Sequence, residues 1–187
     1  CDATQHGRFY IAYTIDGSKT IIKSGSTSSD KLQTVASIDG VEALDIVTIG
    51  DSVYVVVRDS NGHIHVYNKK GTEEGILEDI SCDDARITAK NGELTVVYLV
   101  GNTLYRTYYD GNSWSTPDTV TTDCNTWFDV DYQRSTGCIA VAYRDNTDNT
   151  LCYTYNDGTG WQTPVDIGQI VESHIRLDHS EDLYRIA

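Results

Sequence analysis

Two segments of the sequence share a pattern of threonine, aspartate and tryptophan whose side chains could bind a sugar. The pattern Thr-Tyr-x-Asp-Gly-x-x-Trp-x-Thr-Pro occurs at 107–117 and again at 154–164, an offset of 47 residues. The flat face of an indole packs against the C–H groups of a sugar ring, and a carboxylate accepts hydrogen bonds from hydroxyl groups. The candidate ligand-binding residues of these segments are Trp114, Trp161, Asp110 and Asp157.

The same residues also fit a structural role. Asp-Gly is a hairpin-type turn sequence, because glycine supplies positive φ and the aspartate side chain bonds to the backbone of the turn. The tryptophan that follows would then fold back and fix the turn to its own sheet. Trp127 has no counterpart in the other repeats, and it fits either a single ligand anchor or the apolar core of an inner strand.

These segments lie within a longer repeat of β-strands. A short apolar strand recurs and ends at residues 13, 57, 98 and 143, so the steps are 44, 41 and 45 residues, and a further copy begins at Asp182. Such a period is typical of a β-propeller, in which each repeat forms one four-stranded antiparallel blade. We predict an all-β propeller of about four blades, incomplete at both ends: a partial blade at 1–40, blades at 41–82, 83–124 and 125–170, and a partial blade at 171–187.

The second repeat shows the expected order of strands within a blade. Residues 43–49 form the innermost strand, 52–58 an apolar second strand, 63–67 the third strand and 75–80 the outer strand. An apolar run such as the second strand is typical of a strand that neighbouring blades cover on both faces. The chain is expected to open on a second strand and to stop on one, which leaves open blade edges that favour self-association.

The Asp-Gly-x-x-Trp turn resembles the Asp-box, or BNR, repeat of sialidase-like propellers, whose pattern is Ser/Thr-x-Asp-x-Gly-x-x-Trp. The second copy keeps Thr154, Gly158 and Trp161, whereas Asn156, and Tyr109 in the first copy, stand where the pattern has aspartate. Fucolectin-type and other lectin propellers carry a similar turn. The resemblance implies a propeller of the sialidase or lectin kind, and in Asp-box propellers the motif is structural and lies away from the active site.

A sialidase would need arginines that clamp the substrate carboxylate, a Tyr/Glu nucleophile pair and an acid/base aspartate. Arg58-Asp59 and Arg144-Asp145 recur at the same place in two repeats, which indicates a pairing that belongs to the repeat rather than to catalysis. We therefore predict no catalytic residues and no enzymatic activity. The candidates for the clamp are Arg8, Arg58, Arg86, Arg144, Arg176 and Arg185.

Metal, cofactor and disulfide signals are weak. His63 and His65 alternate on one strand without a third ligand nearby, so we predict neither a metal nor a cofactor. The five cysteines form no CxxC motif. Cys138 and Cys152, on successive strands of one repeat, are the candidates for a disulfide, which would indicate an oxidising, extracellular setting.

Charge and hydropathy exclude two classes of partner. The formal charge of −14 repels phosphate backbones, so we predict no nucleic-acid partner. No apolar run approaches the length of about 18 residues that a membrane helix needs, so we predict no membrane insertion. The sequence contains no methionine, which predicts a processed chain or part of a longer one.

Together these patterns predict a non-catalytic extracellular module that recognises a glycan or a protein partner through the rim loops of a propeller. Two alternatives stay open. The first is a fragment of a sialidase-like glycoside hydrolase, and the second is a structural module of a larger surface or viral assembly.

Overall fold

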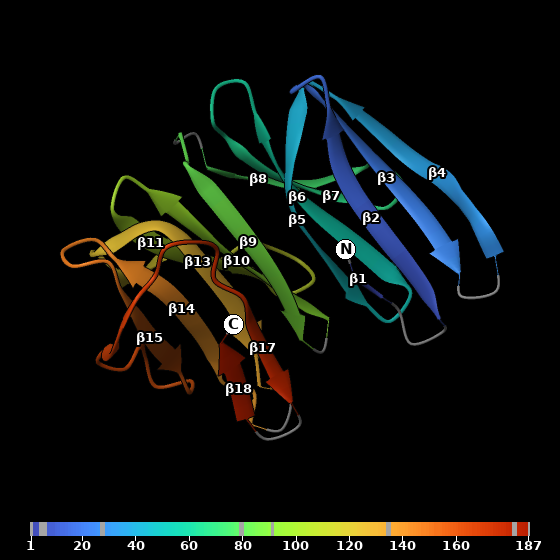
Figure 1. Cartoon of the computed structure of the whole chain (residues 1–187). Helices are drawn as coiled ribbons and strands as arrows, with labels where there is room; N and C mark the ends of the chain where they lie inside the picture. Colours follow the sequence, from blue (N-terminus) through green and yellow to red (C-terminus); the bar gives the residue numbers. More distant parts are fainter. Residues whose placement is uncertain are drawn as a thin grey trace.

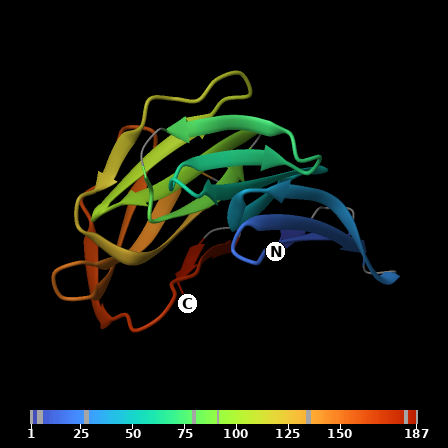
Figure 2. The ribbon, with the colours of Figure 1, turned by 90° about the horizontal axis from the view of Figure 1, so that it is seen from above.

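The structure is a computed structural model. It describes residues 2–3, 7–26, 29–78, 81–90, 92–133, 136–180 and 183–186, which form strands and turns without a helix. Four sheets of four strands each follow one another along the chain, and a two-stranded hairpin comes last. We call the sheets blades 1 to 4 and the hairpin blade 5. Figure 1 shows them side by side as a fan, and Figure 2 shows from above that they follow an arc.

The strands of every blade are antiparallel and neighbours in the sheet are neighbours in the sequence. Blade 1 consists of β1 (Asp2–Ala3), β2 (Arg8–Ile15), β3 (Lys19–Ser26) and β4 (Ser29–Asp39). Blade 2 consists of β5 (Val41–Ile49), β6 (Ser52–Asp59), β7 (Ile64–Asn68) and β8 (Glu73–Glu78). Blade 3 consists of β9 (Asp84–Lys90), β10 (Glu93–Val100), β11 (Thr103–Tyr109) and β12 (Asp118–Thr121). Blade 4 consists of β13 (Cys124–Tyr132), β14 (Ile139–Asp145), β15 (Thr150–Asn156) and β16 (Val165–Ile170), and blade 5 of β17 (Leu177–Ser180) and β18 (Leu183–Ile186).

The start of the chain differs from the sequence-based expectation. The chain does not open on a second strand, because β1 precedes it and pairs Asp2 with Tyr10. A strand of two residues carries no periodicity, so the sequence pattern could not reveal it. The blade boundaries drawn from the repeat remain a prediction, and so does self-association through the edges.

The hydrophobic core lies between the blades rather than within any one of them. Val56 and Val96 belong to a buried cluster between blades 2 and 3, whereas Val55 packs toward blade 1 and Val97 toward blade 4. Alternate residues of one strand therefore face opposite neighbours, which is why the second strands read as unbroken apolar runs. The first strands β5, β9, β13 and β17 contact one another in turn, and this places them on the inner side of the fan.

Buried aspartates of the inner strands join neighbouring blades. Asp45 Oδ2 accepts a hydrogen bond of 3.0 Å from the backbone N–H of Ile87 in blade 3, and Asp129 Oδ2 accepts one of 2.9 Å from Leu177 in blade 5. Burial raises the pKa of Asp45 to about 6, although backbone hydrogen bonds from Ile87 and Ile46 act in the opposite direction. Burial also raises the pKa of Asp129.

The blades at the two ends of the fan expose apolar side chains. Among the residues whose side chains are described, every exposed large hydrophobic residue belongs to blade 1 or blade 4: Ile15, Leu32, Val35, Tyr155, Val165, Ile167 and Ile170. Each of these blades has a face that no described four-stranded blade covers. No described segment forms a helix with the length and apolarity that a bilayer crossing requires.

Candidate functional site

The two Asp-Gly-x-x-Trp segments lie at the same rim of the fan. We call it the lower rim, the end where turns 69–72, 110–117 and 157–164 join third strands to fourth strands. The opposite, upper rim carries turns 16–18, 60–63, 101–102 and 146–149 between second and third strands.

The aspartates of both segments bond to their own turns. Asp110 Oδ1 accepts hydrogen bonds from the N–H groups of Ser113 (2.9 Å) and Asn112 (2.8 Å), which hold the pKa of Asp110 below its usual value. Asp157 Oδ1 accepts from the hydroxyl (2.6 Å) and the N–H (3.0 Å) of Thr159, with the same effect on its pKa. Both glycines have positive φ, 96° at Gly111 and 100° at Gly158, as a turn of this kind requires. Ligand binding by the two aspartates stays a prediction.

The threonine of each segment holds the tryptophan turn in place. The buried hydroxyl of Thr107 donates to the carbonyl of Ser115 at 2.9 Å, and that of Thr154 donates to the carbonyl of Gln162 at 2.6 Å. These two acceptors directly follow Trp114 and Trp161. The threonine-to-tryptophan spacing is therefore explained by one backbone geometry that both blades share.

Trp161 leaves its own blade and joins a cluster on blade 3. Its indole Nε1 donates to Asp118 Oδ2 at 2.9 Å, and Arg106 Nε donates to Asp118 Oδ1 at 2.9 Å. The Arg106 guanidinium also lies near two rings, 5.6 Å from the centre of the Trp161 ring and 5.4 Å from that of Tyr108. The sequence pattern predicted that the tryptophan would fix the turn to its own sheet. The backbone of Trp161 does bridge Asn156 of its own third strand, whereas its indole bonds to the preceding blade.

The sequence analysis missed Arg106 and Asp118. They are paired across β11 and β12, which places their side chains on one face of blade 3. Trp161 reaches them from 43 residues further along the chain, measured from Asp118. The sequence could have indicated this pair, because a basic residue on a third strand and an acidic residue on the fourth strand beside it can lie opposite each other. Their meeting with the tryptophan depends on how the blades pack.

Trp114 occupies the matching place between blades 2 and 3, where it packs on the buried cluster of these two blades. Its indole lies against Gly75 of β8. In the sheet register, Gly75 lies opposite Val66, just as Asp118 lies opposite Arg106 in blade 3. A side chain at Gly75 would collide with the indole, so the glycine gives the tryptophan its space. The Trp114 Nε1 is buried and has no hydrogen-bond partner among the described residues.

Trp127 lies at the upper rim, away from the other two tryptophans. The Arg144 guanidinium stands 4.8 Å from the centre of its ring, and the His174 ring stacks on it at 6.1 Å. Trp127 also packs on the buried cluster between blades 4 and 5, which includes Ala142 and Ile175. The structure therefore does not bring Trp127 together with Trp114 and Trp161. Its role in ligand binding stays a prediction.

Polar grooves separate neighbouring blades at the upper rim. A groove of about 500 Å³ contains the ion pair of Arg58 Nη2 with Glu42 Oε2 at 2.8 Å. A second groove of about 320 Å³ lies between blades 3 and 4 and is lined by Asp84 and Asn125, among others. Both grooves carry acidic side chains and lack tryptophan linings.

The cysteine pair favoured from the sequence does not form a disulfide. Cys82, Cys124, Cys138 and Cys152 are all thiols. Cys152 lies opposite Tyr143 in the sheet, whereas Cys138 precedes Ile139, which lies opposite Asn156. The two cysteines are thus five residues out of register, about 17 Å along the strands, beyond the reach of a disulfide.

The described histidines and arginines pair with acidic or aromatic side chains on different blades. His65 Nδ1 lies 2.6 Å from Glu73 Oε1, and His63 Nδ1 and His65 Nε2 each lie 3.5 Å from Asp59 Oδ2. Within the described part of the chain, no three His, Cys, Asp or Glu side chains are grouped to hold a metal ion. Four of the clamp candidates contact different partners at separate places in the fold: Arg58 pairs with Glu42, Arg86 with Asp84, Arg144 lies over Trp127 and Arg176 lies near Asp129. The side chain of Arg185 lies outside the described residues.

Solved structures of low sequence identity share this architecture. An arginine-to-alanine triple mutant of AofleA from Arthrobotrys oligospora superposes with a TM-score of 0.68 at 14% identity, over 98% of this chain and 62% of that one. The fold is a β-propeller. The Aleuria aurantia lectin in complex with α-methyl-L-fucoside gives a TM-score of 0.59 at 18% identity over 88% of this chain, and the NanB sialidase of Streptococcus pneumoniae gives 0.53 at 13% over 75%.

The propeller described here spans less than two thirds of the length of these neighbours, 62% of AofleA and 58% of the lectin. No protein-family model matches the sequence, and no curated protein matches it either. At identities of 13 to 18% the likeness establishes the fold. What the propeller binds must come from its own residues.

Proposed function

We propose that the protein is a non-catalytic carbohydrate-binding module that holds a sugar at the lower rim between blades 3 and 4. The observation that carries the proposal is the cluster of Arg106, Asp118 and Trp161, in which a guanidinium, a carboxylate and an indole are fixed to one another. Each can bind one part of a sugar, since the charged groups bond to neighbouring hydroxyls and the ring packs on a C–H face.

The cluster is accessible as well as ordered. The Asp118 side chain is 39% exposed and that of Arg106 is 18% exposed, so both charged groups are partly open to solvent. Their mutual hydrogen bonds fix the rotamers in advance, which lowers the entropy that binding would otherwise cost. The matching place between blades 2 and 3 holds Val66 and Gly75, so it lacks both charged groups.

The fold neighbours support a sugar as the ligand class. The Aleuria aurantia lectin is solved with α-methyl-L-fucoside, which makes this sugar the first probe to use. We propose an extracellular setting because exposed glycans are found there. The four described thiols lend this setting no support, since they form no disulfide.

Replacing Arg106 with alanine should weaken binding of α-methyl-L-fucoside at least about 10-fold, because charge-assisted hydrogen bonds to the ligand are lost. Isothermal titration of the whole chain measures the effect. Arg58→Ala is the matched control, since Arg58 also pairs with a carboxylate, Glu42, but at the upper rim. Equal loss in both variants, or binding by Arg106→Ala at the wild-type level, would overturn the assignment of the site. Turnover of a fluorogenic sialoside would favour the glycosidase alternative instead.

A further inference from the structure

Blade 1 carries a small pocket at the lower rim that differs in charge from the rest of the molecule. Its volume is about 170 Å³, and its lining comes from three neighbouring strands: Arg8 of β2, Ser24, Gly25 and Ser26 of β3, and Lys31 and Gln33 of β4. Among the described residues, the lining includes two cations and no carboxylate, in a protein with a formal charge of −14. The two upper-rim grooves, by contrast, are lined by acidic residues such as Asp83.

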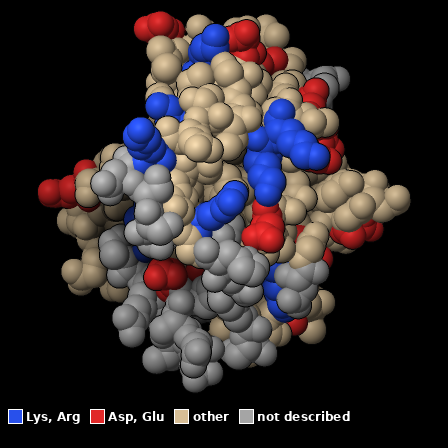
Figure 3. Space-filling view, turned by 90° about the vertical axis from the view of Figure 1, so that its right-hand side faces the viewer, with Lys and Arg blue, Asp and Glu red and all other residues tan. Residues whose placement is uncertain are grey.

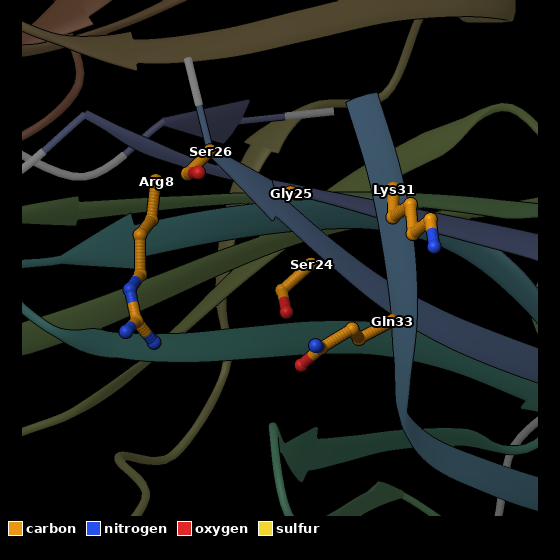
Figure 4. A pocket seen from close by; sticks show the side chains of 6 residues that line it. All are labelled: Arg8, Ser24, Gly25, Ser26, Lys31 and Gln33. Carbon is orange, nitrogen blue, oxygen red and sulfur yellow. The ribbon is translucent and has the colours of Figure 1, made fainter. Parts of the chain in front are cut away.

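The sheet register explains why these side chains share one space. Arg8 lies opposite Ser26 and Ser24 lies opposite Gln33, and residues opposite each other in an antiparallel sheet point to the same face. Figure 4 shows the guanidinium of Arg8, the hydroxyl of Ser24 and the amide of Gln33 directed toward the same side of the blade, with Lys31 at the margin. Figure 3 looks at the side of the molecule that carries blade 1, where several Lys and Arg side chains gather.

The pocket exists because one blade lacks a tryptophan turn. The turns of blades 3 and 4 send Trp114 and Trp161 onto the outer strands of the preceding blades. The corresponding turn of blade 2 is short and carries no tryptophan. Its Gly71 lies near Ala36 and Ile38 of β4, at the part of that strand nearer the upper rim. The lower end of the same face of blade 1 therefore stays uncovered.

We propose that this pocket binds a tetrahedral oxyanion, namely a sulfate or phosphate group. A guanidinium presents paired donors that match two oxygens of such a group, and an ammonium contributes a further charged donor. The hydroxyls of Ser24 and Ser26 and the amide of Gln33 can donate to the remaining oxygens. A volume of about 170 Å³ exceeds that of one oxyanion, and it leaves room for the atom or ring to which the group is attached.

Titration calorimetry of the whole chain at low ionic strength tests the proposal with three probes: inorganic sulfate, inorganic phosphate and N-acetylglucosamine-6-sulfate. Binding of these anions is expected, and Arg8→Ala should weaken it at least about 10-fold, whereas Arg8→Lys keeps the charge and should retain part of the affinity. Lys19→Ala is the control. This substitution also removes one positive charge, but at the opposite end of β3, where Lys19 pairs with Asp39.

The arms of the experiment separate the sources of the anion. Tighter binding of the sulfated sugar than of the free ions supports the pocket and assigns it to an anionic glycan, while equal binding supports it and assigns it to a free ion. Absence of binding by all three probes, or equal effects of Arg8→Ala and Lys19→Ala in variants that melt as the wild type does, overturns the proposal. Neither result bears on binding of α-methyl-L-fucoside by Arg106, Asp118 and Trp161.

Discussion

Replacing Trp161 with alanine should lower the free energy of unfolding by about 3 kcal/mol. The indole packs on the buried cluster between blades 3 and 4, which includes Leu104 and Phe128. Its loss removes that packing, the hydrogen bond to Asp118 and the contact with the Arg106 guanidinium. The effect is expected to be large because the core lies between blades, and a side chain that joins two blades stabilises both.

Urea denaturation of the two proteins measures this difference, and Trp161→Phe is the matched variant. Phenylalanine keeps most of the apolar contact and removes the N–H donor, so its cost should be about 1 kcal/mol. If Trp161→Ala unfolds at the same urea concentration as the wild type, the tryptophan does not hold the blades together. Its position beside Asp118 would then need another explanation.

The stability of the protein should rise as the pH falls from 7 to about 4.5, by about 2 kcal/mol. The pKa of Asp45 is raised from 3.8 to about 6 by burial, so the folded state binds this proton more tightly than the unfolded chain does. The stabilisation is therefore absent well above pH 6, grows as the pH falls through 6 and is complete below 4. Asp110 and Asp157, whose pKa values are lowered by their turns, act with the opposite sign but only below their usual pKa.

Asp45→Asn is the control for this pH dependence. An asparagine is neutral at every pH and keeps one oxygen for one of the two amides that Asp45 accepts from, those of Ile46 and Ile87. Most of the rise in stability between pH 7 and 4.5 should therefore disappear in the variant, with a smaller part left from Asp129, whose pKa is also raised by burial. Unfolding by urea at a series of pH values gives both curves. An unchanged slope in Asp45→Asn would show that the buried carboxyl is not the titrating group.

The repeat made the β-propeller predictable from the sequence, because each blade buries its faces only against its neighbours and so repeats the same apolar strand. Val53–Val57 and Leu94–Tyr98 could be recognised as second strands for this reason. β1 escaped notice because two residues carry no pattern. The prediction of a disulfide between Cys138 and Cys152 was wrong, because their closeness in the sequence gives no information on the register of the two strands.

The candidate site was predictable only in part. Trp161 stood out because its segment is repeated, but its partners Arg106 and Asp118 belong to the preceding blade. The contact that each indole makes on the neighbouring blade depends on one position of the outer strand. This position is Asp118 in blade 3 and Gly75 in blade 2. A repeat reveals the shared geometry, whereas the site arises where the blades differ.

Sugar binding by Arg106, Asp118 and Trp161 is measured most directly by NMR. The indole N–H signals of a ¹⁵N-labelled sample are followed during titration with α-methyl-L-fucoside. The chain has three tryptophans, so three such signals are expected, and one tryptophan-to-phenylalanine variant at a time assigns them. The signal of Trp161 should move with the sugar, while those of Trp114, whose indole lies against Gly75, and Trp127, at the upper rim, stay in place. A Trp161 signal that does not move at saturating sugar, or movement of Trp127 alone, would contradict the account.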